Sequence, residues 1–434
     1  MCKPCFSKGT FMNDKIKNIW VLCHYAQQPP YNTMLRYHNW GKQLVKRGYT
    51  VKIVAASTVH NTEIDVIEKI KSDQSVCEGI NYKYLSTSQY YGNGVGRMKN
   101  MLEFCLKLRK LKCCKERPDV IIICGAYLYL FVRHYFRNIP IITDIVDLWP
   151  ASIIEYSNVS EKNLLVQILY QVEKAAYIKT DALIFSMEGG KDYVRERKYS
   201  KKVAENKIFH INMGIDLTEA DRNRAAVDLV LPWNMDKKNI VYIGSVRKAN
   251  NVQQICDAAL ELQKRGICDV EFQIYGNGDE LDSLIKYCKE KKIHNIFFYG
   301  RIEKSKIPFI LEHSTANILT YKQVHLMKYG GSQSKLFDYL ASGKPIICNA
   351  KFGYNLIERY NCGLVTENQT SKAFANTVER LCALSEAELN LMGKRARQAA
   401  EEYDQPNLVN RLCSIFEYLN KRKEAGNEQN DSIC

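Results

Sequence analysis

The residues best suited to chemistry in this chain lie in one glycine- and serine-rich stretch, residues 328–347. A Gly-Gly pair opens a turn, a helix is predicted to begin at about Ser334, and Lys335 lies in its first turn. Free backbone N–H groups, the positive end of the helix dipole and a lysine together favour a phosphate. One helical turn later, the Asp338 carboxylate can accept hydrogen bonds from hydroxyl groups. The stretch is predicted to bind a ligand with phosphate and hydroxyl groups, or else to be an ordinary turn with a solvated lysine.

Three further loops in the second half place a glycine directly after a predicted strand. They contain Gly244 with Arg247 and Lys248, Gly276 and Gly278 with Asp279, and Gly300 with Arg301. In an open α/β sheet, ligands bind beyond the carboxyl ends of the strands. A tight turn explains any one of these glycines. Four such loops, three of which carry Arg or Lys, favour a nucleoside diphosphate. A dinucleotide-binding fingerprint and a Walker phosphate-binding loop are missing from the sequence.

Strands alternate with helices along nearly the whole chain, which predicts parallel α/β sheets. We expect strands at residues 18–24, 50–56, 82–86, 119–124, 139–145, 181–186, 239–243, 270–275, 295–299, 316–321 and 345–349. A chain of 434 residues is long enough for two domains. The predicted fold class is therefore α/β with two doubly wound, Rossmann-like domains.

The domain boundary is predicted where Pro232 and mixed charge interrupt this periodicity. The polar C-terminal end is predicted to be disordered. The predicted parts are a flexible leader (1–14), an N-terminal domain (15–220), a linker (221–238), a C-terminal domain (239–405), a C-terminal helix (406–422) and a disordered tail (423–434).

The net charge of +15 is concentrated in the first half of the chain. Residues 1–220 hold 32 Lys and Arg against 21 Asp and Glu, whereas residues 221–434 hold 30 against 26. Such a surplus suits an anionic membrane surface, an anionic lipid or nucleic acid. Residues 95–117 favour the membrane over nucleic acid, because apolar residues recur there at helical spacing beside Lys107, Arg109, Lys110, Lys112, Lys115 and Arg117. A core-facing helix with a solvated basic side has the same periodicity.

The 16 cysteines are expected to be reduced, because neither a signal peptide nor an apolar run of bilayer length is recognised. Cys2 and Cys5 form a CxxC motif without a second pair, so no metal site is expected there. We expect the protein in the cytoplasm, or peripherally bound to the cytoplasmic face of the inner membrane.

Nearly the whole chain resembles the family 4 retaining glycosyltransferases of the GT-B type, specifically the subgroup that builds bacterial O-antigen and capsular polysaccharides. The resemblance is carried by residues 328–346, by Asp147-Leu148-Trp149-Pro150, by residues 36–51 and by residues 212–216. It implies two Rossmann-like domains facing across a cleft, with the C-terminal helix crossing back to the first domain. It also implies a nucleotide diphosphate sugar as donor, no further cofactor, and an acceptor hydroxyl, expected on a lipid-linked saccharide.

The resemblance also implies roles for residues of the two domains. Asp338 would hold the ribose hydroxyls, while the loops 276–279 and 300–302 would flank the base. The N-terminal domain would bind the acceptor, with Arg36 reaching an acceptor phosphate unless it is a solvated helix residue. The residues expected around the donor diphosphate are Ser332, Gln333, Ser334, Lys335, Arg247 and Lys248.

The expected reaction develops negative charge on the leaving diphosphate. Lys335, helped by Arg247 or Lys248, would neutralise it, a role that Mg²⁺ has elsewhere, so a metal is not expected. Asp147, at a predicted strand end, is the candidate for orienting or deprotonating the acceptor hydroxyl. A cap before Trp149-Pro150 explains Asp147 equally well.

Two departures from the family pattern leave other functions open. Gly330 stands where the family usually has the first of two carboxylates, and Ser245 replaces a usual arginine after Gly244. A sugar-nucleotide 2-epimerase of similar fold and a catalytically silent nucleotide-sugar-binding subunit therefore remain alternatives. An NAD-dependent oxidoreductase is a third, disfavoured by the missing fingerprint.

Overall fold

The computed structural model describes residues 16–32, 35–92, 94–157 and 159–431. The predicted leader, with Cys2 and Cys5, lies outside the described residues. By its internal contacts the chain divides into two units. The first unit comprises Met1–Asp144, Lys179–Leu183 and Val409–Cys434, and the second comprises Ile145–Ile178 and Ile184–Leu408.

An eight-stranded sheet has the strand order β3-β4-β2-β1-β5-β6-β7-β8. Strand β1 pairs in parallel with β2 and β5, and only the β3–β4 hairpin is antiparallel among the pairs with a defined register in the described chain. The strands are β1 Asn18–Leu22, β2 Thr50–Ala56, β3 Gln74–Cys77, β4 Ile80–Leu85, β5 Val120–Cys124, β6 Ile141–Ile145, β7 Ala182–Phe185 and β8 Ile208–His210.

Helices separate most of these strands, as a parallel sheet requires. They are α1 Arg36–Lys46, α2 Val66–Ile70, α3 Val95–Lys107, α4 Tyr129–Tyr135, α5 Ala151–Tyr156, α6 Leu164–Lys179, α7 Gly190–Glu196 and α8 Leu217–Ala226. Where one helix was predicted over residues 95–117, α3 ends at Lys107 and a 3-10 turn, Leu108–Cys113, follows it.

A six-stranded sheet in the second unit has the order β11-β10-β9-β12-β13-β14, and all of its pairs are parallel. Its strands are β9 Lys238–Ile243, β10 Val270–Tyr275, β11 Ile296–Gly300, β12 Ala316–Leu319, β13 Ile346–Cys348 and β14 Gly363–Val365. The helices that follow α8 are α9 Gln253–Lys264, α10 Leu281–Glu290, α11 Ile307–Glu312, α12 Ser334–Ala341, α13 Leu356–Arg359, α14 Ser371–Cys382, α15 Glu386–Glu402 and α16 Gln405–Asp431.

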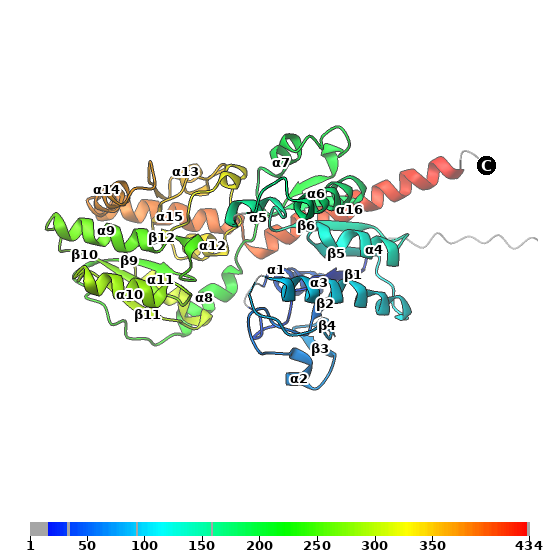
Figure 1. The fold of residues 1–434 in the computed structure, drawn as a ribbon, viewed down its shortest axis with the longest axis horizontal. Helices are drawn as coiled ribbons and strands as arrows, with labels where there is room; N and C mark the ends of the chain where they lie inside the picture. The colour runs from blue at the N-terminus through cyan, green and yellow to red at the C-terminus, as the bar shows by residue number, and fades with distance from the viewer. Residues whose placement is uncertain (1–15, 33–34, 93, 158, 432–434) are drawn as a thin grey trace, which may run out of the picture. The chain divides into compact units, whose positions relative to one another are not determined.

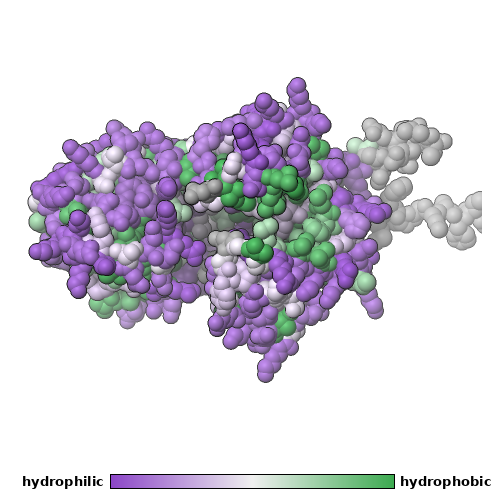
Figure 2. Space-filling model, in the orientation of Figure 1, coloured by the Kyte–Doolittle hydropathy of each residue, from purple (hydrophilic) through white to green (hydrophobic). Residues whose placement is uncertain are grey.

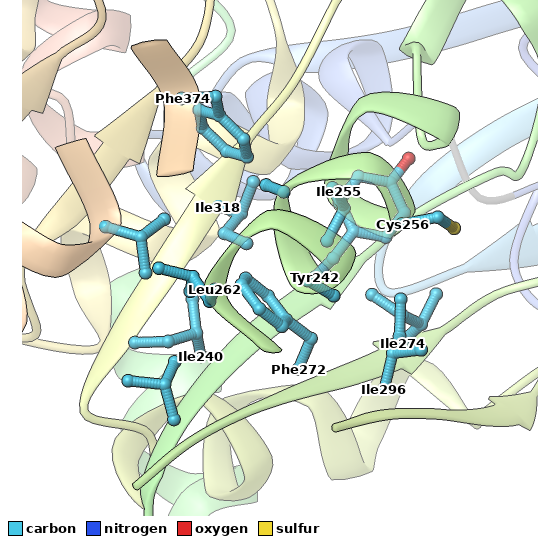
Figure 3. Close-up of a cluster of buried hydrophobic side chains, with 14 of the residues drawn as sticks. Ile240, Tyr242, Ile255, Cys256, Leu262, Phe272, Ile274, Ile296, Ile318 and Phe374 are labelled. Carbon is cyan, nitrogen blue, oxygen red and sulfur yellow. The ribbon is translucent and has the colours of Figure 1, made fainter. Parts of the chain in front are cut away.

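The core of the six-stranded sheet forms because alternate residues of β9 and β10 are apolar and face the same helices. Figure 3 shows Ile240 and Phe272 from these strands near Leu262 of α9 and Phe374 of α14. All four side chains are fully buried. Burying one such side chain stabilises a fold by about 1.5–3 kcal/mol, so this cluster fixes the strands whose ends carry the candidate site.

The predicted domain boundaries need correction, because residues 145–178 and 184–220 of the predicted N-terminal domain belong to the second unit. The predicted linker 221–238 is partly helical, because α8 extends to Ala226, and β9 begins at Lys238. The predicted tail is helical up to Asp431, because α16 continues past Arg422. The part of α16 from Val409 onward belongs to the first unit, where Phe416 lies 5.8 Å from Tyr49 between ring centroids.

Among the residues that the structure describes, no helix is both long and apolar enough to cross a membrane. Figure 2 shows a visible surface that is mostly hydrophilic, with hydrophobic residues gathered in a few places.

Candidate active site

Lys335 lies at the start of α12, and its side chain is enclosed by polar and aromatic groups. Its Nζ is 3.3 Å from the hydroxyl oxygen of Tyr242 and 3.3 Å from Oδ1 of Asn250. The same Nζ lies 4.9 Å from the ring centroid of Tyr242 and 4.5 Å from that of Tyr321. The lysine thus points to the carboxyl end of β9, where Tyr242 lies near the end of the strand and Asn250 lies in the loop that follows.

Burial lowers the pKa of Lys335 to about 7, although Cys348 nearby opposes this effect slightly. In the described part of the chain no carboxylate pairs with Lys335. A buried ammonium without a counter-ion is unfavourable. An anion bound beside it would therefore restore the protonated form.

The predicted glycine loops converge at this point because their backbones touch. A Cβ added to Gly244 would lie 2.7 Å from Cδ of Lys335, and one added to Gly276 would lie 1.7 Å from the carbonyl oxygen of Gly244. A Cβ on Gly278 would lie 2.1 Å from the carbonyl oxygen of Val246. Close packing of neighbouring loops thus explains Gly276 and Gly278. A Cβ added to Gly300 would meet open space, so close packing does not explain this glycine. The carbonyl oxygen of Gly300 accepts a hydrogen bond from the backbone N–H of Gly276 at 2.7 Å.

The charged residues predicted in these loops reach the surface. Arg247, Lys248, Asp279 and Arg301 are all exposed. Within the described residues none of the three cations forms an ion pair. They are therefore available to an anionic ligand at the strand ends, whereas Lys335 is enclosed.

Asp338 and Gly330 line different pockets. Asp338 lines a small pocket together with Asp221 and Arg224 of α8 and residues of α11. Burial raises the pKa of Asp338 to about 6, against the opposing charge of Lys304. Asp338 thus faces α8 and α11, one helical turn after Lys335 on α12.

The serine loop lies against the carboxyl end of β6. The hydroxyl of Ser332 donates to the carbonyl oxygen of Val146 at 3.2 Å. The next residue is Asp147, whose exposed carboxylate accepts a hydrogen bond from the hydroxyl of Ser152 at 3.1 Å. Ser332 and Asp147 are thus neighbours, as a shared site requires. Gln333 precedes α12, which no side chain caps, and Ser334 is exposed.

Arg36 requires a correction. Its guanidinium is buried and binds both carboxylate oxygens of Asp144, at 2.8 and 3.0 Å. The hydroxyl of Tyr37 donates to the same carboxylate at 2.8 Å, and the Trp40 ring lies 4.1 Å below the guanidinium. Arg36 is therefore part of an internal ion pair in the first unit, and it is not an exposed contact for an acceptor phosphate.

A second small pocket lies beside the glycine turn and is lined by residues that the sequence patterns did not single out. Its polar side chains are those of Glu188, Asn212, Gln333, Tyr354 and Asn355, beside the backbone of Gly330 and Gly331. Glu188-Gly189-Gly190 follows the predicted strand 181–186 after one residue, Met187. The search for glycines directly after a strand missed it, and a search that allowed two intervening residues would have found it.

Residues 224–399 match the family described as "Glycosyl transferases group 1". This segment is therefore similar to the group 1 glycosyltransferases. It contains the four glycine loops of the second unit, including the Lys335 loop.

Three further comparisons extend this result. The putative teichuronic acid biosynthesis glycosyltransferase TuaH of Bacillus subtilis is 24% identical over 210 residues, or 48% of this chain and 49% of TuaH. The match thus spans about half the length of that relative. Sucrose-phosphate synthase from Thermosynechococcus elongatus aligns over 93% of this chain and 99% of its own, at 16% identity and a TM-score of 0.73. HepE of Anabaena, in complex with UDP, aligns over 92% and 100%, at 11% identity and a TM-score of 0.65. The chain has the GT-B fold.

Proposed function

We propose that the protein is a retaining, metal-independent glycosyltransferase that uses a nucleotide diphosphate sugar. It transfers a hexosyl or N-acetylhexosaminyl group to an acceptor hydroxyl. The observation that carries this proposal is Lys335, an enclosed lysine without a counter-ion, at the start of α12 in the segment that matches the group 1 glycosyltransferases. A diphosphate supplies the missing negative charge, and the uncapped first turn of α12 supplies backbone donors.

The chemistry follows from this placement. The bond between C1 of the sugar and the diphosphate oxygen breaks, and the acceptor oxygen bonds to C1. Lys335 and the first turn of α12 stabilise the charge that develops on the diphosphate. One such pre-positioned donor is worth about 3 kcal/mol in the transition state. The exposed Arg247 and Lys248 contribute further positive charge from the β9 loop.

We assign the acceptor side to Asp147. Its carboxylate is exposed and follows Val146, which accepts the hydrogen bond from Ser332. The acceptor hydroxyl would bind between this carboxylate and the donor, and its proton would pass to Asp147 or to the departing diphosphate. Asp338 and the loops at Gly276 and Gly300 are the proposed contacts to the nucleoside.

We further propose a lipid-linked saccharide acceptor, in the synthesis of a cell-surface polysaccharide. TuaH, named for teichuronic acid biosynthesis, supports the polysaccharide part. The lipid part is supported by α3, which has two apolar faces. Phe104, Cys105 and the following Leu108 are buried, whereas Val95, Met98, Leu102 and Leu106 are 82, 49, 51 and 47% exposed.

Basic residues adjoin the exposed apolar face of α3. Arg109, Lys110, Lys112 and Lys115 follow the helix and are exposed. Exposed apolar residues beside a basic cluster are typical of segments that bind an anionic lipid surface. We therefore propose that α3 holds the protein at the cytoplasmic face of the membrane, where a lipid-linked acceptor is found.

The test is a transfer assay with labelled UDP-, GDP- and dTDP-sugars and polyprenyl-diphosphate-linked saccharides. We expect one donor to label the lipid fraction. NMR of the product should show that the anomeric configuration of the donor is retained. Lys335→Ala should lower the rate by about 100-fold or more, the effect of losing one charge-stabilising donor. Conversion of the donor alone to its 2-epimer would instead indicate the epimerase. Donor binding without any turnover would indicate the silent subunit.

A further inference from the structure

Three side chains of the types that bind metal ions meet at the edge of the eight-stranded sheet. Among the described residues, His38, Cys77 and Glu78 are the one such group, and their ligand atoms all lie within 4.8 Å of one another. His38 belongs to α1, whereas Cys77 ends the edge strand β3 and Glu78 begins the turn to β4. The fold thus brings together ligands from two segments that lie 40 residues apart in the chain.

The imidazole of His38 is held with one nitrogen toward this group. Its Nδ1 lies 2.8 Å from the hydroxyl oxygen of Tyr82 on β4, and its Nε2 lies 2.6 Å from Oε2 of Glu78. The ring is buried, with 5% of the side chain exposed. Metal-binding histidines are oriented in this way, by a hydrogen bond at the nitrogen that does not bind the ion. His38 therefore presents Nε2 as a ligand in a fixed position.

Glu78 occupies a turn position that does not favour its residue type. Cys77 pairs with Ile80, so Glu78 and Gly79 form a two-residue turn, with φ values of 50° and 79°. Such turns favour Asn or Asp followed by Gly, because both residues adopt the left-handed conformation. Residues held in this conformation against their preference cluster at functional sites. A role for the Glu78 carboxylate in binding explains why a glutamate stands there.

The turn is fixed against α1. A Cβ added to Gly79 would lie 2.8 Å from Cγ1 of Val45, so the turn and the helix are in close contact. Lys42 of the same helix lies 3.5 Å from Oε1 of Glu78, while Oε2 faces His38. Lys42 thus orients the carboxylate through its other oxygen. The Glu78 side chain is 53% exposed, so an ion can reach the group from solvent.

The ligand types select the class of ion. A thiolate and an imidazole suit Zn²⁺, whereas Mg²⁺ and Ca²⁺ prefer oxygen ligands alone. One nitrogen, one sulfur and one oxygen ligand, with water in the fourth position, complete a tetrahedral zinc site. Binding requires the thiolate, so the ion displaces the proton of the Cys77 thiol, which is released to solvent.

We propose that Nε2 of His38, Sγ of Cys77 and the carboxylate of Glu78 bind a Zn²⁺ ion that joins the β3–β4 turn to α1. Tyr82 and Lys42 are positioning residues for two of these ligands. The site lies in the first unit, whereas Lys335 lies in the second. The ion stabilises the first unit and takes no part in the proposed transfer, so this inference does not rest on the proposed function.

The experiment uses the full chain, freed of metal with a chelator and kept reduced with a phosphine. Co²⁺ serves as the probe, because tetrahedral Co²⁺ bound to a thiolate shows intense d–d bands and a sulfur-to-metal charge-transfer band. We expect these bands in the native protein and their loss in Cys77→Ser. Cys113→Ser, at an exposed cysteine outside the site, is the matched control, and Cys2→Ser/Cys5→Ser removes the CxxC motif. Both controls should keep the bands.

Thermal unfolding measures the effect of the ion on the fold. Zn²⁺ should raise the melting temperature of the native protein and Mg²⁺ should not, since only an ion that binds the folded state stabilises it. Glu78→Asn removes the carboxylate and suits the turn, so the metal-free variant should fold. Its affinity for Zn²⁺, and that of Cys77→Ser, should fall by about tenfold or more in competition with a chromophoric chelator.

Three results would overturn the proposal. Bands of equal intensity in the native protein and in Cys77→Ser would place the ion at other thiols. The absence of tetrahedral bands from the native protein would show that the three ligands do not form a site. An affinity for Zn²⁺ that is unchanged in Glu78→Asn would exclude its carboxylate. Each of these results leaves the proposed function standing, because the transfer assay tests that function separately.

Discussion

The pKa of Lys335 makes nucleotide binding sensitive to pH near neutrality. Its value of about 7 means that the free protein loses the ammonium charge as the pH rises through 7. A diphosphate binds the protonated form, so its affinity should fall above pH 7, by up to about tenfold per pH unit. We expect the dissociation constant of the bound nucleotide diphosphate to rise between pH 6.5 and 8.5.

Lys335→Arg is the matched control for this titration, because arginine stays charged over the whole range. In this variant the dissociation constant should change much less between pH 6.5 and 8.5, and the remaining change should come from titration of the nucleotide itself. Lys286→Ala, at an exposed lysine of α10, should behave like the native protein. An unchanged pH profile in Lys335→Arg would contradict a direct contact between Lys335 and the diphosphate.

Glu173 is a second buried group with a shifted pKa, and it affects stability instead of binding. It accepts hydrogen bonds from the hydroxyls of Tyr193, at 2.7 Å, and Tyr199, at 3.2 Å, and burial raises its pKa to about 7. The folded state therefore binds a proton that the unfolded state releases at lower pH. The resulting stability is full below about pH 4.5 and is lost as the pH rises to 7.

We expect Glu173→Gln to remove this pH dependence. Between pH 4.5 and 8, the free energy of unfolding of the native protein should fall by on the order of 3 kcal/mol relative to that of the variant. Urea midpoints of both proteins at pH 5.5 and pH 8 measure the difference. Parallel changes of the two midpoints with pH would show that Glu173 titrates normally in the folded protein.

At the scale of elements, the glycine loops at the ends of β9 and β10 are held by backbone contact. A Cβ at Gly276 would be placed 1.7 Å from the carbonyl oxygen of Gly244, whereas a Cβ at Gly300 would meet open space. Gly276→Ala should therefore cost at least about 3 kcal/mol, because the two loops must separate. Gly300→Ala should cost only about 1 kcal/mol, from its positive φ of 69°. Urea unfolding measures the free energy of unfolding of both variants. Equal decreases in the two variants would contradict the proposed packing of the loops.

Helix α3 makes the membrane proposal testable at the same scale. Replacing Met98, Leu102 and Leu106 with serine removes exposed apolar surface and spares the buried Phe104. We expect this triple variant to lose at least tenfold in binding to phosphatidylglycerol vesicles at low salt, while the double variant Ile285→Ser/Leu391→Ser, in the second unit, binds normally. Failure of the native protein to sediment with such vesicles would refute the proposal for α3.

The sequence predicted the strands and helices that build the six-stranded sheet well, because their apolar periodicity is strong. It predicted the start of α12 at Ser334 and both bounds of β10, Val270–Tyr275, as observed. The short strands β3, β8 and β14 were missed, since each contains a polar residue or glycine, whereas the equally short β13 is the apolar run Ile-Ile-Cys.

The site was harder to predict than its elements. The glycines and cations of the loops could be predicted, because they directly follow the predicted strands. The contacts among these residues could not be predicted, because packing turns Arg36 toward Asp144 and places Asp338 and Gly330 in different pockets. Glu188 and Asn355 join that pocket from distant segments, a proximity that only the folded chain reveals.

For the whole molecule, the central claim is that the Lys335 loop binds the diphosphate of a nucleotide sugar. The most direct test measures the melting temperature of the native protein and of Lys335→Ala with UDP, GDP and dTDP and with the matching monophosphates, since a ligand of the folded state raises that temperature. We predict that one diphosphate raises it in the native protein, that its monophosphate raises it far less, and that Lys335→Ala abolishes the difference. No shift with any diphosphate, or an equal shift in Lys335→Ala, would contradict the claim.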